Sequence, residues 1–239
     1  IAGNEPGERR RQLERVTQKI HENFADQLRK AYKDHYIAPE GEGDAAGNAL
    51  SWHIYPALGA ENLLRGIPEF AVALVQKKEG RTENLLLVNP VSGEEYSSSR
   101  GRGAALNSRR VRISDVRQLA EAELISNLLS HAKGSDDPLL WGEISAALAS
   151  QSGGVRTSGC TVLDIARVAA GHLDAAIIFR PQAEDLDIGL AIANESGALS
   201  GDFSGNPSNP ESRQLVIANP KLFKEVLRTL HPFRGRLPR

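Results

Sequence analysis

Near its start, this chain of 239 residues contains a long charged stretch with apolar residues at every third or fourth position. The stretch runs from Glu8 to Tyr32, and its apolar residues are Leu13, Val16, Ile20, Phe24, Leu28 and Tyr32. This spacing places the apolar side chains on one face of an α-helix. A helix with one apolar face must bury it, so we predict that the segment 8–32 is a helix lying on a sheet.

Two short runs rich in β-forming residues follow the helix, at 70–74 and 85–88. The residues Lys77 to Arg81 between them include a Gly and several charges, which is typical of a hairpin turn. A segment rich in Gly, Ala and acidic residues, 41–47, reads as a loop. The sequence therefore predicts an N-terminal α+β lobe, residues 1–113, built from helix and antiparallel sheet.

The pattern becomes helical from Ser114 onward. We expect helices at 115–129, 141–149, 162–170, 188–193 and 221–230. The uninterrupted apolar run 175–179 reads as a buried strand, and 201–212 as a surface loop before a closing strand. These elements predict a C-terminal α/β lobe, residues 114–239.

Composition limits the kinds of partner. The 29 basic and 30 acidic residues nearly cancel, which disfavours a general nucleic-acid binder without excluding it. A single cysteine, Cys160, rules out an internal disulfide framework and suits a reducing compartment. The sequence contains neither an apolar run of about 18 residues nor a signal peptide, so we expect a cytoplasmic protein that does not enter a membrane.

Seven short segments then appear in a fixed order along the chain. They are W-H-I-Y-P-A-L-G-A (52–60), N-L-x-x-G-x-P-x-F (62–70), R-G-R-G-A (100–104) with Asn107, G-x-x-x-L-D-I-A (159–166), A-A-G-H-L-D-A (169–175), N-E-S-G-A (194–198) and I-A-N-P (217–220). Together they resemble the inositol monophosphatase family, whose members carry W-x-x-D-P-x-D-G-T at the first of these places. The resemblance implies the layered α-β-α-β-α sandwich of the inositol monophosphatase and fructose-1,6-bisphosphatase type. It also implies a homodimer and a further helix before Ile1.

Enzymes of the resembled family hold two or three Mg²⁺ ions with converging carboxylates, because this hard cation prefers oxygen ligands. Carried over by position, two of the family's metal carboxylates remain, as Glu40 and Asp185. Three others are replaced, by Thr17, Tyr55 and Leu58.

Two further family residues are also changed. The threonine that helps to orient the attacking water falls on Ala60, and the glutamate that grips an inositol hydroxyl falls on Ile178. Two remaining carboxylates leave the charge of several dications uncompensated, so we do not expect the usual cluster. At most one weak Mg²⁺ site at Glu40 and Asp185 is expected.

Alternative interpretations of the candidate metal and phosphate sites remain open. Shifted carboxylates, Glu42, Asp44, Glu184 and Asp187, offer a rebuilt one-ion site, although charged loop residues are mostly solvated. Tyr55 and Leu58 read as side chains that fill the space vacated by metals. The turn at Gly59, Ala60 and Glu61 offers backbone N–H groups to a small phosphorylated ligand, but the carboxylate of Glu61 would repel it.

We expect structural roles for three other reactive side chains, those of His35, His53 and Cys160. An arginine cluster could contact RNA or an acidic protein: Arg100, Arg102, Arg109, Arg110, Arg112, Arg234, Arg236 and Arg239. No aromatic residues interleave with the arginines of the 100–112 hairpin, as they do in single-strand binders.

Three hypotheses follow for function. The leading one is a catalytically impaired pseudophosphatase that acts by binding or assembly with a protein partner. The alternative is an active Mg²⁺-dependent phosphomonoesterase on inositol or sugar phosphates, with an altered metal site. The third is a transcription- or RNA-associated scaffold similar to the extragenic-suppressor branch of the resembled family, which assists transcription antitermination.

Overall fold

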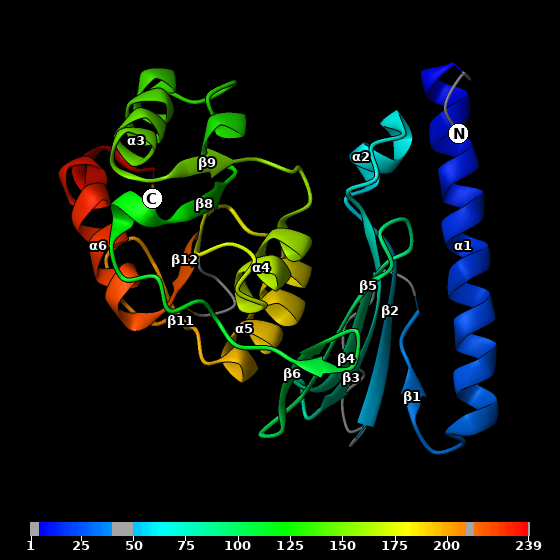
Figure 1. The fold of residues 1–239 in the computed structure, drawn as a ribbon. Helices are drawn as coiled ribbons and strands as arrows, with labels where there is room; N and C mark the ends of the chain where they lie inside the picture. Colours follow the sequence, from blue (N-terminus) through cyan, green and yellow to red (C-terminus); the bar gives the residue numbers. More distant parts are fainter. Residues whose placement is uncertain (1–4, 40–49, 209–212, 239) are drawn as a thin grey trace. The chain divides into compact units, whose positions relative to one another are not determined.

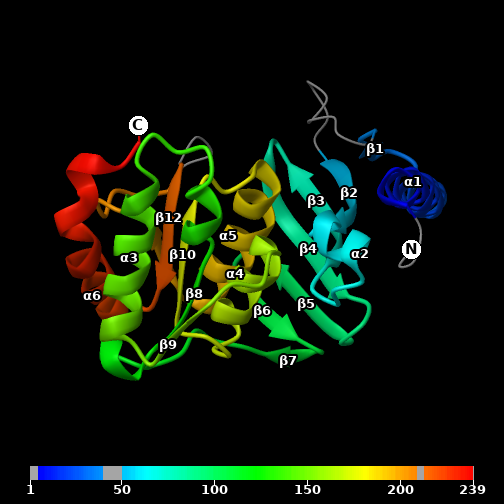
Figure 2. The same cartoon turned by 90° about the horizontal axis from the view of Figure 1, so that it is seen from above.

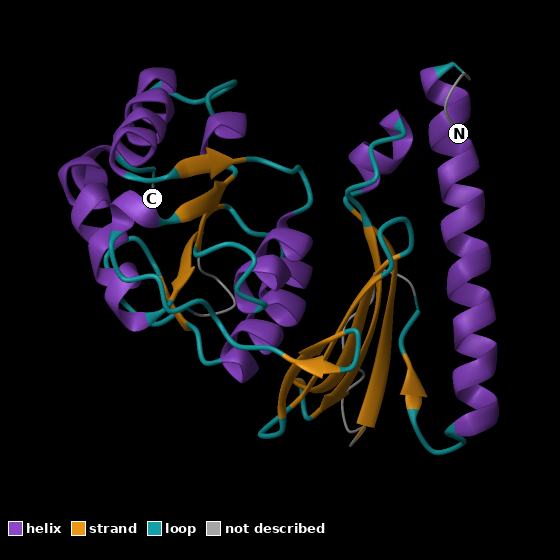
Figure 3. Ribbon diagram, in the orientation of Figure 1, coloured by secondary structure: helices purple, strands orange, loops and turns teal. Residues whose placement is uncertain are grey.

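The computed structural model describes residues 5–39, 50–208 and 213–238, so the predicted loop at 41–47 lies outside the described residues. The chain divides into two units, Ile1–Arg109 and Arg110–Arg239, and each is considered by itself. Figure 1 shows the elements coloured along the sequence, and Figure 3 shows the same view coloured by secondary structure. The sequence alone had placed the boundary between residues 113 and 114.

The first unit contains a sheet whose strands follow one another in chain order, β1-β2-β3-β4-β5-β6-β7. Its elements are α1 (Pro6–Ala31), β1 (Tyr36–Ile37), β2 (Leu50–Leu58), α2 (Ala60–Arg65), β3 (Ala71–Lys78), β4 (Arg81–Asn89), β5 (Glu94–Ser99), β6 (Gly103–Leu106) and β7 (Arg109–Arg110). The pair β1 and β2 is parallel, whereas the pairs from β2 to β6 are antiparallel. The predicted helix plus antiparallel sheet is thus present.

The predicted amphipathic helix is α1, and its second half packs on the sheet. Ala25 and Leu28 form a buried cluster with Ile37 of β1 and Ile54 of β2. The predicted apolar face is only partly used, because some of its members remain exposed by more than a third of their surface. These are Val16, Phe24 and Tyr32.

The predicted hairpin joins β3 and β4. Its turn contains Glu79 and Gly80, both with positive φ, at 50° and 75°. Two successive positive φ values give the turn a twist that suits a two-stranded hairpin, and Gly adopts such values without strain. Val75 pairs with Leu85 across the two strands, and both side chains are buried.

The second unit contains a five-stranded sheet with the order β11-β12-β10-β8-β9. Its elements are η1 (Leu119–Glu121), β8 (Glu123–Ser126), η2 (Leu128–His131), α3 (Pro138–Gln151), β9 (Gly154–Arg156), α4 (Thr161–Ala169), β10 (Ala175–Phe179), the π-helical turn η3 (Asp185–Gly189), α5 (Leu190–Ser196), β11 (Leu199–Gly201), β12 (Gln214–Ala218), α6 (Pro220–Leu230) and η4 (His231–Arg236). Strands β8, β9 and β10 are parallel, and β12 runs antiparallel to β10 and to β11.

Helices cover both faces of this second sheet. Figure 2 shows α3 and α6 on one face and α4 and α5 on the other. The central strand β10 is consequently buried throughout, each residue being 0 to 1% exposed. An uninterrupted apolar run is what a strand covered on both faces requires, so the strand predicted at 175–179 is confirmed.

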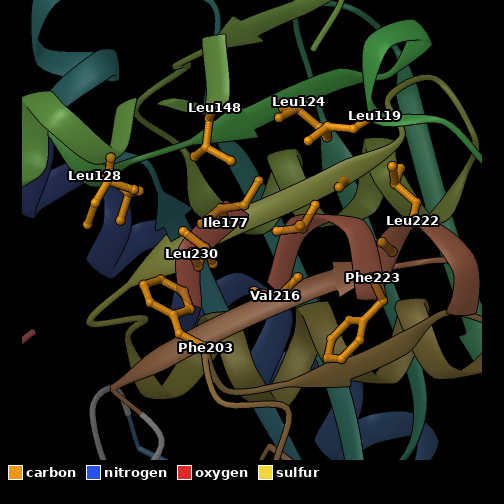
Figure 4. Close-up of a cluster of buried hydrophobic side chains, with 14 of the residues drawn as sticks. Leu119, Leu124, Leu128, Leu148, Ile177, Phe203, Val216, Leu222, Phe223 and Leu230 are labelled. Carbon is orange, nitrogen blue, oxygen red and sulfur yellow. The ribbon is translucent and has the colours of Figure 1, made fainter. Parts of the chain in front are cut away.

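The face under α3 and α6 forms the larger buried cluster. Figure 4 shows Leu124 and Ile177 of the sheet meeting Leu148, Leu222 and other side chains of the two helices. Such a cluster removes many apolar side chains from water, at about 25 cal/mol for each Å² buried. It fixes the positions of the loops that follow β8 and β10.

One predicted helix is wrong. The segment 115–129 contains the 3₁₀ turn η1, the strand β8 and the start of η2 instead of a continuous helix. Its apolar residues recur at helical spacing, yet Leu124 and Ile125 are needed in a strand that pairs in parallel with β10. Pairing in the sheet overrides the local pattern here. The other predicted helices of this unit are present with shifted ends.

Candidate functional site

The segment 52–60, which resembles the family's metal-binding segment, lies at the end of β2 and the start of α2. Strand β2 extends through Leu58. Gly59 then adopts left-handed backbone angles, φ 79° and ψ 36°, and α2 begins at Ala60. Because left-handed angles suit Gly better than other residues, Gly59 allows the abrupt change from strand to helix.

Two of the replaced carboxylate positions, Tyr55 and Leu58, lie in this strand. Tyr55 pairs with Ala73 of β3 and Leu58 with Ala71, with an irregularity in the register between them. The side chain of Leu58 is buried, at 7% exposure. It offers no oxygen to a cation, and a phenol of pKa about 10 is a poor substitute for a carboxylate at neutral pH.

The turn at Gly59, Ala60 and Glu61 carries a compensated charge. Arg10 of α1 donates from Nη2 to Oε1 of Glu61 across 2.8 Å, and both side chains are largely exposed. The repulsion that Glu61 would exert on an anion is reduced by this pair. The helix that follows spans only Ala60–Arg65, too short to build an anion site from its N-terminus alone.

Thr17, the third replaced carboxylate position, is far from both ends of its helix. It lies inside α1, which begins at Pro6. Its hydroxyl donates to the backbone carbonyl of Glu14 across 3.0 Å, a local bond that polar residues often make within helices. Glu40, the first retained carboxylate, lies outside the described residues.

Asp185, the second retained carboxylate, is the first residue of η3 and is 7% exposed. Its Oδ2 accepts a hydrogen bond from the backbone N–H of Gln182 across 2.9 Å. Burial raises the pKa of Asp185 to about 7, the Gln182 hydrogen bond opposes this rise, and the charge of Glu184 adds to it. At neutral pH this carboxyl is therefore divided between its neutral and charged forms.

Of the matched positions that the structure describes, Thr17, Tyr55, Leu58 and Asp185, one carries a carboxylate for the family's magnesium cluster. Over residues 5–39, 50–208 and 213–238, no three or more His, Cys, Asp or Glu side chains are placed to hold a metal ion. Asp185 would have to lose its proton before it could bind a cation, which opposes metal binding near and below neutral pH.

The histidines and the cysteine make internal contacts. His35 accepts a hydrogen bond at Nδ1 from Trp52 Nε1 across 3.0 Å and stacks on Tyr32 at 4.9 Å. His53 is buried and lies 3.2 Å from the hydroxyl of Ser51. Cys160 is buried at the residue before α4. These contacts suit structural roles.

The predicted arginine cluster is only partly available for a partner. Arg100 pairs with Glu83, and Arg234 donates to the carbonyl of Phe203. Arg236 pairs with Asp137 and Glu143, and Arg239 lies outside the described residues. The exposed members are Arg102, Arg109, Arg110 and Arg112.

A positively charged pocket lies between α1 and α2, and it was not predicted from the sequence. Its volume is about 400 Å³, and we call it the arginine pocket. It is lined by Gly7, Arg9, Arg10, Glu61, Leu64 and Arg65. The signal for it is weak in sequence, because the arginines come from segments some 55 positions apart and only the packing of α1 beside α2 unites them.

Within the described ranges, no helix has the length and apolar character needed to cross a bilayer. The sequence and the fold are both similar to known proteins. The chain is 37% identical over 209 residues to the Nus factor SuhB of Pseudomonas aeruginosa, covering 86% of this chain and 77% of that protein.

Two solved structures show the same fold. The extragenic suppressor protein SuhB of Bartonella henselae matches with a TM-score of 0.78 and 23% identity, covering 92% of this chain and 89% of that chain. The IMPase of Thermotoga maritima matches with a TM-score of 0.75 and 25% identity, covering 88% and 80%. These likenesses confirm the predicted mixed fold class.

The sequence profile of the inositol monophosphatase family matches residues 4–233, nearly the whole chain. The motifs that carried the resemblance lie within this span. The chain therefore belongs to the inositol monophosphatase family.

Proposed function

We propose that this protein acts by binding within a transcription complex in the cytoplasm, and that it does not hydrolyse phosphate monoesters. The observation that carries the proposal is the buried side chain of Leu58 at the end of β2. At the matching position the family motif has an aspartate. An apolar side chain there removes ligand oxygens and fills the space with hydrocarbon.

Charge supports the same conclusion. A pair of dications and a phosphate dianion need several fixed carboxylates around them. Asp185 is one carboxyl with a pKa raised to about 7 by burial, and Tyr55 and Leu58 contribute none. We infer that a family cluster of Mg²⁺ does not assemble.

The proposed binding within a transcription complex is supported by the names of similar proteins. A protein 37% identical to this chain is named as a Nus factor, and so is one from Escherichia coli that is 30% identical over 204 residues. By analogy, this chain would use its surface to bind RNA or a protein of the transcription machinery. Arg102, Arg109, Arg110 and Arg112 are exposed and suit the RNA phosphates of such a complex.

The first experiment measures Mg²⁺ binding by calorimetry and phosphate release from a panel of inositol and sugar phosphates. It uses this chain, its Asp185→Asn variant and the Thermotoga maritima IMPase as a positive control. We expect neither binding nor release from this chain. Mg²⁺ binding and turnover that both vanish in Asp185→Asn would instead establish a phosphomonoesterase with a rebuilt site.

The second experiment tests the positive role. Binding to single-stranded RNA and to a reconstituted transcription elongation complex is measured over a range of salt concentrations. We expect binding that weakens as salt rises, is reduced by changing Arg102, Arg109, Arg110 and Arg112 together to Gln, and is unchanged in Asp185→Asn. Equal binding by the wild type and the arginine variant would reject this surface as the contact.

A further inference from the structure

The arginine pocket has the size of a site for a small molecule. Its volume of about 400 Å³ falls within the range of ligand sites, roughly 300 to 1,000 Å³. It lies within the first unit, between the N-terminal part of α1 and the helix α2. None of the residues carried over from the family's metal site lines it.

The charge of the pocket is unbalanced. Three guanidinium groups face a single carboxylate, that of Glu61, so two positive charges remain. Glu61 is already paired with Arg10 across 2.8 Å. Within the part of the chain that the structure describes, Arg65 has no carboxylate partner. A dianion would neutralise what the protein leaves uncompensated.

Arg9 is held in place beside this charge. Its Nη1 donates to the backbone carbonyl of Leu64 across 3.2 Å, which fixes the guanidinium at the wall of the pocket. Its Nε is buried and has no hydrogen-bond acceptor among the described residues. A buried donor without an acceptor is uncommon in proteins, so the hydrogen-bonding capacity of this side chain is not fully used within the described residues.

The chemistry of guanidinium groups narrows the ligand. A planar guanidinium presents N–H donors in a fork that matches the oxygens of a phosphate, and a guanidinium already held by the protein loses little freedom on binding. A phosphate monoester carries nearly two negative charges near pH 7, whereas each phosphodiester of RNA carries one. The monoester therefore matches the two uncompensated charges better.

We propose that the arginine pocket binds a small phosphate monoester through Arg9 and Arg65, without a metal ion. Of the turn at Gly59, Ala60 and Glu61, only Glu61 lines the pocket. Its ligand would occupy the space between α1 and α2 and join the first turn of α1 to α2. The binding is independent of the proposed role in transcription.

Gly7 provides a test that leaves the arginines unchanged. It lies in the first turn of α1, and a Cβ built on it meets no atom within 4 Å. Gly7→Glu would place a carboxylate in the pocket as an internal competitor of the ligand. The fold should tolerate it, because Glu is a better helix former than Gly and an acidic side chain is favourable in the first turn of a helix.

The experiment titrates the full chain with inorganic phosphate and with glycerol 3-phosphate by calorimetry, at low salt and in the presence of EDTA. We expect binding of both probes by the wild type, at least tenfold weaker binding by Arg65→Gln, and no measurable binding by Gly7→Glu. The matched control is Arg29→Gln, which removes an exposed arginine from the other end of α1, where it pairs with Asp26. This control should bind as the wild type does.

Circular dichroism verifies that each variant is folded. A wild type that binds neither probe would overturn the proposal, as would equal binding by the wild type and Gly7→Glu. A parallel titration with single-stranded RNA separates the two sources of phosphate. If RNA alone bound and Gly7→Glu abolished that binding, the pocket would be an RNA contact and the small-ligand proposal would be wrong.

Discussion

The side chain of Asn127 forms hydrogen bonds with both backbone groups of Phe179. Its Nδ2 donates to the carbonyl of Phe179 across 2.9 Å, and its Oδ1 accepts from the N–H of Phe179 across 2.8 Å. The last paired residue of β8 is Ser126, which pairs with Ile177. Asn127 thus binds the last residue of β10 beyond the end of β8. The segment that leads to Asp185 begins directly after this residue.

We predict that Asn127→Ala lowers the free energy of unfolding by about 1 to 3 kcal/mol, because two partly buried hydrogen bonds are lost. The measurement is urea unfolding followed by fluorescence in a Trp52→Phe background, where Trp141 of the second unit is the remaining tryptophan. Asn206→Ala removes an exposed amide of the same unit, whose Nδ2 donates to Asp202 across 2.8 Å, and should cost much less. Equal losses in the two variants would show that the two hydrogen bonds to Phe179 contribute no more to stability than an exposed amide does.

Gly189 lies directly against Ile165 of α4. A Cβ at this position would lie 2.7 Å from Cδ1 and 3.2 Å from Cβ of Ile165, which is itself fully buried. We predict that Gly189→Ala destabilises the second unit by about 1 to 3 kcal/mol, the usual effect of overpacking a core. Thermal unfolding measured by calorimetry provides the check.

Gly142 is the matched control for this change. It lies inside α3, and a Cβ built on it meets nothing within 4 Å. Gly142→Ala should stabilise the protein by about 0.5 to 1 kcal/mol, because Ala is the better helix former. A stabilising Gly189→Ala would mean that α4 and η3 adjust to the added methyl group.

The raised pKa of Asp185 gives stability a dependence on pH. Because burial raises this pKa to about 7 from its ordinary value of 3.8, the unfolded chain releases the proton at lower pH than the folded chain. Stability from this group is therefore full below about pH 4, falls as pH rises toward 7, and is constant above it. Asp185→Asn should be more stable than the wild type at pH 8, by on the order of 2 to 4 kcal/mol, and similar to it near pH 4.

Urea unfolding of both proteins between pH 4 and pH 8 measures this difference. Asp136→Asn makes the same change at an exposed position and should leave the pH profile unaltered. A difference between the wild type and Asp185→Asn that does not change with pH would contradict the assignment of a raised pKa to this carboxyl.

Leu58→Asp restores one carboxylate of the family motif and tests whether the site can hold a cation. We predict a loss of at least about 3 kcal/mol at pH 8, because an ionised group replaces a buried apolar one. Addition of Mg²⁺ should not recover this loss, since Tyr55 and Ala60 still lack the family's groups. Val91→Asp, at a position 61% exposed in the same unit, should be nearly neutral. Recovery of stability by Mg²⁺ would indicate that this single substitution is enough to restore a metal site.

Much of the secondary structure could be predicted because it is encoded locally. The periodicity from Leu13 to Leu28 predicted α1, and the continuous apolar run from Ala175 to Phe179 predicted β10. The segment 115–129 could not be predicted in this way. Its apolar spacing is compatible with a helix, and only the pairing of β8 with β10 and β9 selects the strand.

The candidate sites, too, could be predicted only in part from the sequence. Gly59 was expected to form a tight turn, and it does so with left-handed backbone angles. The burial of Asp185 and the resulting rise in its pKa depend on packing that no local pattern reveals. The arginine pocket needed α1 to lie beside α2, which brings Arg9 to the carbonyl of Leu64. Sequence shows which side chains are present, whereas long-range packing decides which of them meet.

The strand orders of the two sheets have a consequence for how the chain reaches its native state. In the first unit every strand pairs with its neighbour in sequence, so native contacts close short loops. In the second unit β8 and β10 pair across the whole of α3, β9 and α4, so far longer segments must be ordered first. Because folding slows as the sequence separation of contacts grows, we expect the first unit to fold faster. It is also the unit synthesised first, so the order of translation and the order of folding agree.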